Sequence, residues 1–138
     1  MADKPRFVFD TNVLISALLL PNSTPRIAVR RAIENGTLLQ SEATLREIAD
    51  VLRRDKLSRY VTPIEREAFL RRLIEDCEIA TPREAISACR DPSDNKFLEL
   101  SVEGEAITLV SGDQDLLALN PFRGIDIVTP SEFVKRYS

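Results

Sequence analysis

The sequence contains no histidine among its 138 residues, and this absence excludes several kinds of catalytic site. Ser-His-Asp and Cys-His catalysis both need an imidazole base. Imidazole-based cleavage of RNA and His-ligated zinc are excluded for the same reason. Hydrolytic chemistry in this chain must therefore use carboxylates, lysines, hydroxyls or a metal held by oxygen ligands.

Cysteine is nearly absent, since Cys77 and Cys89 are the only two. They lack CxxC spacing, and there is no histidine to complete a zinc site. We expect two reduced thiols; the alternative, a disulfide, would need an oxidising compartment.

Long hydrophobic runs are missing too. The longest, from Val13 to Leu20, is interrupted by Ser16 and is too short to span a bilayer. No apolar signal-peptide core follows the N-terminus, so we expect a cytoplasmic protein without a membrane segment. A length of 138 residues, 43% of them hydrophobic, predicts one globular domain over residues 1–138.

The charge gives no sign of non-specific binding to nucleic acid. Lysine and arginine number 19 and the acids 22, so the formal net charge is 19 − 22 = −3. Bound divalent cations can nevertheless offset a cluster of acids.

Short apolar runs alternate along the chain with segments of helical periodicity. The expected strands are Arg6–Phe9, Thr37–Gln40, Cys77–Ala80, Ala106–Val110 and Ile125–Val128. The expected helices are Val13–Leu20, Arg26–Glu34, Glu42–Arg54, Ile64–Asp76, 91–103, Gln114–Leu119 and Pro130–Tyr137. Thr11 or Asn12 is expected to cap the first helix and Thr24 the second. This alternation predicts an α/β fold with a parallel sheet.

Acidic residues follow the strands at positions that one sheet edge can bring together. Asp10 follows the first strand, and Asp113 and Asp115 follow the fourth. Asp94 lies in the first turn of a helix that begins at this edge, and Glu47 lies in the helix after the second strand. Sites in open parallel sheets form beyond the carboxyl ends of the strands, so all five acids can reach one site.

Each acid also has a structural interpretation. Asp10 can cap a helix, and Asp113 and Asp115 can be turn and first-turn acids that the helix dipole stabilises. Glu47 alone is weak evidence, because most helix glutamates are solvated. Asp91, followed by a proline, is best explained as a helix cap.

Asp94 is the acid for which a functional role is favoured over a structural one. It shares a helix side with Phe97 and Leu98, where an ionised carboxylate is costly unless it is paired or metal-bound. The alternative is an acid that interacts with the helix cap and dipole. In the later motif, Gly112 is expected to let the backbone bend tightly before Asp113.

Together the acids suggest a Mg²⁺ or Mn²⁺ site. These ions prefer oxygen ligands, and paired ions can activate water and stabilise the leaving oxygen of a phosphodiester. Carboxylates crowded together repel one another without the cation, which predicts raised pKa values in the metal-free protein.

Four segments resemble the ordered motifs of the PIN-domain family, especially its branch of toxin components of toxin–antitoxin systems, the VapC-like ribonucleases. The segments are 10–17 (DTNVLISA), 44–48 (TLREI), 91–100 (DPSDNKFLEL) and 111–117 (SGDQDLL). The resemblance covers nearly the whole chain. It matches Asp10, Glu47, Asp94 and Asp113 to the catalytic, metal-binding acids, with Asp115 as an accessory ligand.

The resemblance implies a three-layer α/β/α fold with a central parallel sheet of four to five short strands. It also implies cleavage of single-stranded RNA with Mg²⁺ or Mn²⁺, a cognate antitoxin and a homodimer. Thr11, Asn12 and Ser111 would support the metal ligands or face the phosphate. Every motif acid is present, so nothing in the sequence indicates a degenerate site.

A basic stretch beside Glu47 has two interpretations. Its residues are Arg46, Arg53, Arg54, Lys56 and Arg59. They could follow an RNA backbone, or they could form a solvated helix face with pairs of opposite charge four residues apart.

Two other functions fit part of the pattern. An aspartyl-phosphate phosphatase of the haloacid dehalogenase type also has its nucleophile after the first strand, but needs a second acid where this chain has Asn12. A catalytically silent module with this fold could bind RNA or a protein.

Overall fold

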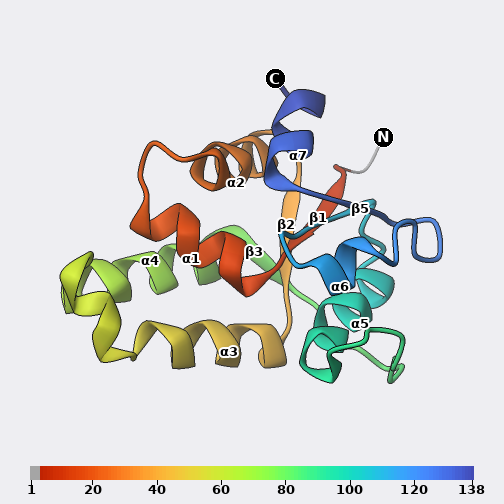
Figure 1. The fold of residues 1–138 in the computed structure, drawn as a ribbon, viewed down its shortest axis with the longest axis horizontal. Coiled ribbons are helices and arrows are strands. Elements are labelled where there is room, and N and C mark those ends of the chain that lie inside the picture. Colours follow the sequence, from red (N-terminus) through yellow and green to blue (C-terminus); the bar gives the residue numbers. More distant parts are fainter. Residues whose placement is uncertain (1–3) are drawn as a thin grey trace.

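The computed structural model describes residues 4–138, which form a parallel sheet between two layers of helices (Figure 1). The strands are β1 (Arg6–Phe9), β2 (Thr37–Gln40), β3 (Cys77–Ile79), β4 (Thr108–Val110) and β5 (Asp126–Val128). The helices are α1 (Thr11–Leu19), α2 (Thr24–Asn35), α3 (Glu42–Leu52), α4 (Pro63–Asp76), α5 (Asn95–Glu103), α6 (Gln114–Leu117) and α7 (Pro130–Arg136). Two 3₁₀ helices, η1 (Asp55–Arg59) and η2 (Pro92–Asp94), precede α4 and α5. The predicted three-layer α/β/α fold with a parallel sheet is confirmed.

The strand order places a reversal of the chain beside β1. The order is β3-β2-β1-β4-β5, and every neighbouring pair is parallel. The chain builds outward from β1 through β2 to β3, and then crosses to the other side of β1 to form β4 and β5. The carboxyl ends of β1 and β4 therefore flank the point where connections leave in opposite directions, which is where open α/β sheets bind ligands.

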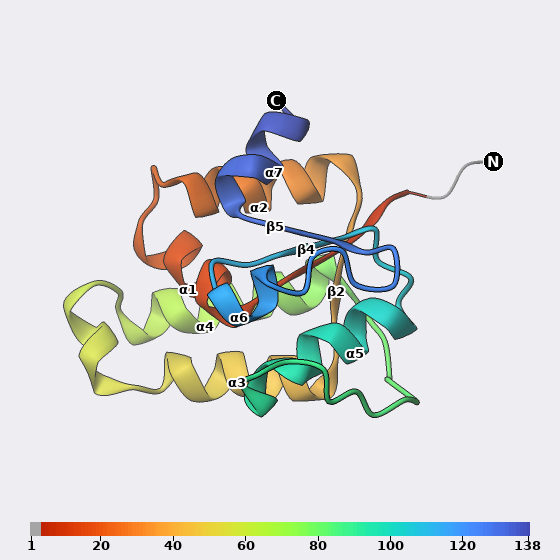
Figure 2. The ribbon, with the colours of Figure 1, turned by 45° about the vertical axis from the view of Figure 1, so that its right-hand side comes forward.

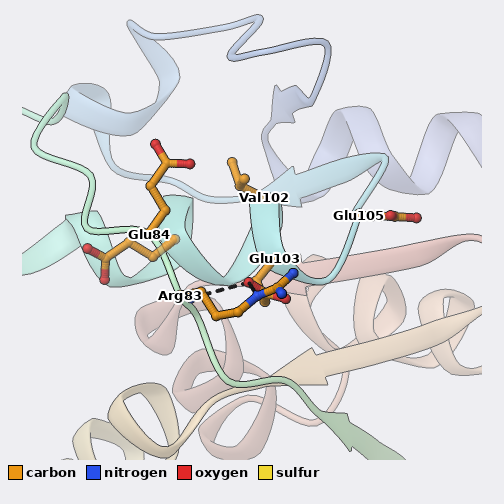
Figure 3. A pocket seen from close by; sticks show the side chains of 6 residues that line it. Arg83, Glu84, Val102, Glu103 and Glu105 are labelled. Carbon is orange, nitrogen blue, oxygen red and sulfur yellow. Dashed lines mark hydrogen bonds and ion pairs between the residues drawn. The ribbon is translucent and has the colours of Figure 1, made fainter.

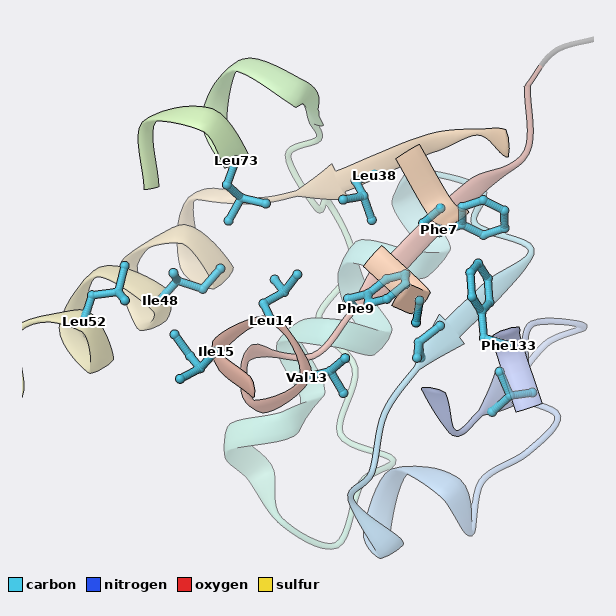
Figure 4. Packing of buried hydrophobic residues seen from close by; sticks show 14 of the residues in the cluster. Phe7, Phe9, Val13, Leu14, Ile15, Leu38, Ile48, Leu52, Leu73 and Phe133 are labelled. Carbon is cyan, nitrogen blue, oxygen red and sulfur yellow. The ribbon is translucent and has the colours of Figure 1, made fainter. Parts of the chain in front are cut away.

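Alternating side chains of β1 divide the core between the two faces of the sheet. Phe7 and Phe9 point into a cluster that is covered by α1, α2, α3, α4 and α7. The ring of Phe133 packs edge-on against both rings, with centroid distances of 5.0 Å to Phe7 and 5.4 Å to Phe9 (Figure 4). Val8 points into the opposite cluster, which α5 and α6 cover. This period of two follows from the pleat of a strand, and burial on both faces fixes the register of β1.

Two predicted helix caps are wrong by one or two residues. Asp10 is the N-cap of α1, because its side chain accepts a hydrogen bond from the backbone N–H of Val13. This confirms the structural interpretation of Asp10, whereas the expectation of a cap at Thr11 or Asn12 is wrong. Ser23, rather than Thr24, caps α2. In both cases the residue before the expected one has extended backbone dihedrals and a side-chain oxygen that reaches the free N–H groups.

The predicted helix over residues 91–103 is divided in two. Asp91 caps η2 as expected, accepting a hydrogen bond from Ser93 N–H, and the regular turns of α5 begin only at Asn95. The predicted helix that ended at Arg54 stops at Leu52, and η1 follows. The strands predicted at 106–110 and 125–128 are shorter, Thr108–Val110 and Asp126–Val128.

Both cysteines are free thiols in the structure, as expected, and Cys89 is buried. Among the helices of residues 4–138, none combines the length and apolar character that crossing a bilayer requires.

Gly36 provides a sharp test of how α2 joins β2. A Cβ atom there would lie 2.2 Å from the carbonyl oxygen of Pro5 and 2.7 Å from the ring of Phe7. We predict that Gly36→Ala lowers the free energy of unfolding by about 2 kcal/mol, because neither neighbour is free to move. Urea denaturation measures the loss. Gly112→Ala is the control, since a Cβ there meets nothing within 4 Å; equal midpoints for the two variants would contradict this packing.

Candidate metal centre

Asp10 lies directly after β1, at the reversal point of the sheet, and only 4% of it is exposed. One carboxylate oxygen accepts from Val13 N–H at 2.8 Å, and the other accepts from the Ser111 hydroxyl. Burial raises the pKa of Asp10 above its usual value, the contacts with Ser111 and Val13 partly oppose the rise, and the charge of Asp113 adds to it. The carboxylate is thus held in one orientation in a place that disfavours its charge.

Ser111 connects Asp10 to Asp113. It follows β4, is fully buried, and accepts a hydrogen bond from the backbone N–H of Asp113 at 2.9 Å while donating to Asp10. The Asp113 carboxylate in turn accepts from Asp115 N–H at 2.8 Å and caps the short helix α6. Asp113 and Asp115 therefore have the turn and first-turn roles that the sequence left open.

Asp94 lies at the junction of η2 and α5 and has the largest perturbation. Its pKa is raised to about 7, first by burial, then by contact with the Asp113 carboxyl, and then by the charges of Asp113, Asp91 and Asp10. Its Oδ2 is buried without a hydrogen-bond partner among the described residues. An unpartnered carboxylate oxygen close to other acids is a donor that a divalent ion would satisfy, so the chemistry of these three aspartates suits such an ion.

Glu47, on α3, has a different environment. Its Oε2 lies 2.5 Å from the ammonium of Lys96, which also donates to the carbonyl of Ser93 at 2.5 Å. Helices α3 and α5, which supply the two partners, pack side by side (Figure 2). Asp10, Asp94 and Asp113 are therefore close enough for their charges to affect one another's pKa values. Glu47 is instead in an ion pair with Lys96.

Across residues 4–138, no three acidic or cysteine side chains are already arranged around a common point at which a metal could sit. Ser111 links Asp10 to Asp113, and Asp113 raises the pKa of Asp94. Binding an ion would require their carboxylates to turn toward it, and the Glu47 carboxylate to leave Lys96.

A surface cavity of about 310 Å³ opens beside this cluster. Asp10, Asn12, Gly112 and Asp113 contribute to its wall. The expectation that Gly112 serves a tight bend is wrong, because its φ is not in the left-handed region and a Cβ would meet nothing. Glycine at this position instead leaves the approach to Asp10 and Asp113 open.

Thr11 and Asn12, expected to support the site, face different surroundings. Thr11 is buried, and its hydroxyl has no hydrogen-bond partner among residues 4–138. Asn12 is exposed and lines the cavity, at the position where a phosphatase of the dehalogenase type would need an acid.

Two of the five residues of the basic stretch pair with nearby acids. Arg46 lies 2.5 Å from Glu42 within α3, and Arg53, the C-cap of α3, lies 3.1 Å from Asp50. Arg54 and Lys56, at the start of η1, are exposed. For Arg46 and Arg53 these contacts match the interpretation of a solvated face with local pairs.

A second cavity, of about 420 Å³, lies away from the aspartates (Figure 3). Arg83 and Glu103 meet across it at 3.2 Å, and Glu84, Glu99 and Glu105 also line it. Arg83 pairs with Glu103 and Arg123 with Glu84. Asp10, Glu47, Asp94, Asp113 and Asp115 do not line this cavity.

Two residues of the third motif have roles that the sequence analysis did not assign. Asn95 is buried and accepts a hydrogen bond from Cys89 N–H at 2.9 Å, which fixes the preceding loop to the start of α5. Lys96 holds Glu47. Their position directly after Asp94 was the only signal available in the sequence.

The fold and its carboxylate edge define a class of α/β/α domains with acids at the switch point of a parallel sheet. The PIN-domain family model matches residues 6–115, and the chain belongs to this family. PIN domains are generally nucleases and typically use divalent metals.

One relative and two solved structures extend the comparison. An uncharacterized protein of Methanocaldococcus jannaschii is 31% identical over 144 residues, which cover 97% of this chain and 92% of that protein. A chain in the crystal structure of VapBC2 from Rickettsia felis bound to a DNA fragment from its promoter has a TM-score of 0.62 at 13% identity, covering 90% of this chain and 98% of that one. The crystal structure of PAE2754 from Pyrobaculum aerophilum has a TM-score of 0.64 at 13% identity, covering 96% of this chain and 89% of that one. The two solved structures support the fold.

Proposed function

We propose that this chain is a metal-dependent endoribonuclease that hydrolyses phosphodiester bonds of single-stranded RNA. The observation that carries the proposal is the meeting of Asp10, Asp94 and Asp113 at the switch point, with the buried Oδ2 of Asp94 left without a partner. Membership of a family of nucleases supports it.

Asp10, Asp94 and Asp113 would hold Mg²⁺ or Mn²⁺, with Glu47 and Asp115 completing the set. The bound ion supplies Lewis acidity for the attack of water on the phosphodiester. The chain's own residues orient the groups: Ser111 and the N–H of Val13 fix the Asp10 carboxylate, and Ser111 also positions Asp113. The open wall at Asn12 and Gly112 gives a phosphate access, and the Asn12 amide can donate to it.

We further propose that the chain is the toxin of a toxin–antitoxin pair that acts in the cytoplasm. The similarity of its fold to a chain of VapBC2 supports a cognate antitoxin as the partner. A homodimer is the expected assembly, and light scattering on the purified protein measures it.

One observation favours a second candidate, a silent RNA- or protein-binding module. The Lys96 ammonium already compensates Glu47, and no three acids are preassembled around one point among residues 4–138. Such a module would bind without cleaving.

The two candidates separate in one assay. Labelled single-stranded RNA is incubated with the protein and Mn²⁺, with and without EDTA. A nuclease cleaves it, EDTA stops the cleavage, and Asp10→Asn with Asp94→Asn abolishes it. Binding without cleavage identifies the silent module, and cleavage unchanged by both substitutions means that these acids are not the site.

A further inference from the structure

The ion pair between Lys96 and Glu47 is unusually enclosed for this protein. The two side chains are 21% and 31% exposed, whereas Arg46 and Glu42 are 69% and 85% exposed. Partial removal of water strengthens the attraction between opposite charges relative to an exposed pair. The pair also connects two different helices, so its geometry depends on how α3 and α5 pack.

The Lys96 ammonium donates hydrogen bonds to two acceptors. It bonds the carbonyl of Ser93 at 2.5 Å as well as Oε2 of Glu47 at 2.5 Å. Ser93 directly precedes Asp94, so the ammonium is anchored to the same turn that carries an aspartate of the proposed centre. The segment 91–100 thus places the Asp94 carboxylate and the Lys96 ammonium close to each other.

We propose that Lys96 is an internal competitor of the divalent ion for Glu47, and that it sets how tightly this protein binds the ion. The inference rests on the proposed metal-dependent function. The Lys96 ammonium holds Oε2 of Glu47, so a divalent ion that takes this oxygen as a ligand must displace the ammonium. Lys96 is therefore a positioning residue: it determines where the Glu47 carboxylate lies before the ion binds.

The proposal predicts the effect of removing the lysine charge on binding of Mn²⁺ alone, measured by calorimetry with the full chain. Lys96→Gln frees Glu47 and is expected to tighten Mn²⁺ binding about tenfold, or about 1.4 kcal/mol. Lys96→Arg keeps the charge and is expected to stay within about twofold. Lys135→Gln, at an exposed lysine of α7, controls for the change in net charge.

A double-mutant cycle with Glu47→Gln separates competition for this carboxylate from a general field effect. In the Glu47→Gln background, Lys96→Gln is expected to change Mn²⁺ affinity by less than about twofold. Equal tightening in both backgrounds would overturn the proposal, because it would show that the ammonium acts on the site as a whole.

Unchanged or weaker binding by Lys96→Gln would also overturn it, and would show that the lysine simply ties α3 to α5. Urea denaturation of each variant shows whether the fold is retained, and Lys96→Met provides a second neutral side chain of similar length. Failure of the proposed function gives a different result: wild-type protein and Asp94→Asn then bind Mn²⁺ equally poorly, whatever stands at position 96.

Discussion

Asp10→Asn is expected to lower Mn²⁺-dependent cleavage of single-stranded RNA by at least about a hundredfold, or roughly 3 kcal/mol of transition-state stabilisation. Asparagine has the shape of aspartate but no charge to hold a divalent ion. Initial rates on a labelled oligonucleotide measure the loss. Asp126→Asn, at an exposed strand end paired with Arg136, is the matched control and should retain wild-type rates.

The same substitution should leave the fold intact, which separates charge from structure at this residue. Asparagine is as good an N-cap as aspartate, so it can still accept from Val13 N–H. Because burial disfavours the charged carboxylate, the neutral amide has no desolvation penalty of that kind. Asp10→Ala loses the cap and should cost about 1 kcal/mol or more. A cleavage rate for Asp10→Asn equal to that of wild type would remove Asp10 from the site.

The raised pKa of Asp94 predicts that the metal-free protein is less stable at neutral pH than at acidic pH. Its pKa of about 7 in the folded protein exceeds the usual value of 3.8, so between these values the folded protein binds the proton more tightly than the unfolded chain. Stability from this group is therefore fully present below pH 4 and is lost as pH rises to 7. Because Asp94 is only partly buried, we expect a loss of about 1–2 kcal/mol after allowing for solvent screening.

Asp94→Asn should remove this loss. Relative to wild type, the variant is expected to gain stability between pH 5 and pH 8 in EDTA, measured by urea denaturation at both pH values. Saturating Mn²⁺ should reverse the order at pH 8, since an ion at 100 times its Kd stabilises wild type by about 2.7 kcal/mol. Glu75→Gln, at an exposed acid of α4, controls for net charge. A difference between variant and wild type that does not change with pH would contradict the raised pKa.

The fold was accessible from the sequence because its local signals agree. The alternation of apolar runs with helical periodicity predicted all five strands and the parallel sheet. β1 is buried on both faces, as a central strand of such a sheet must be. Asp91 was recognised as a cap because a proline follows it. Boundaries and caps failed where two polar residues compete, as at Asp10 and Thr11, because the backbone dihedrals that decide the cap depend on where the strand ends.

The candidate site was accessible only in part. Strand ends predicted that Asp10 and Asp113 lie near one another, and Ser111 links them. Burial is the main cause of the raised pKa values of Asp10 and Asp94, and the predicted repulsion between acids adds to it. The Lys96–Glu47 pair was not predictable, because it depends on how α3 packs beside α5, and sequence spacing contains no such information. The role of Gly112 was misjudged for a related reason: only coordinates show that its backbone is ordinary and that its surroundings are open.

The central claim is that Asp10, Asp94 and Asp113 share one divalent ion. An anomalous difference map from crystals soaked in Mn²⁺ tests it most directly. The account predicts a single strong peak, or a close pair, within about 2.2 Å of carboxylate oxygens of Asp10 and Asp94 and beside Asp113. A peak confined to other acids, such as Glu84 and Glu103 at the second cavity, or no peak in a crystal of active protein, would contradict it.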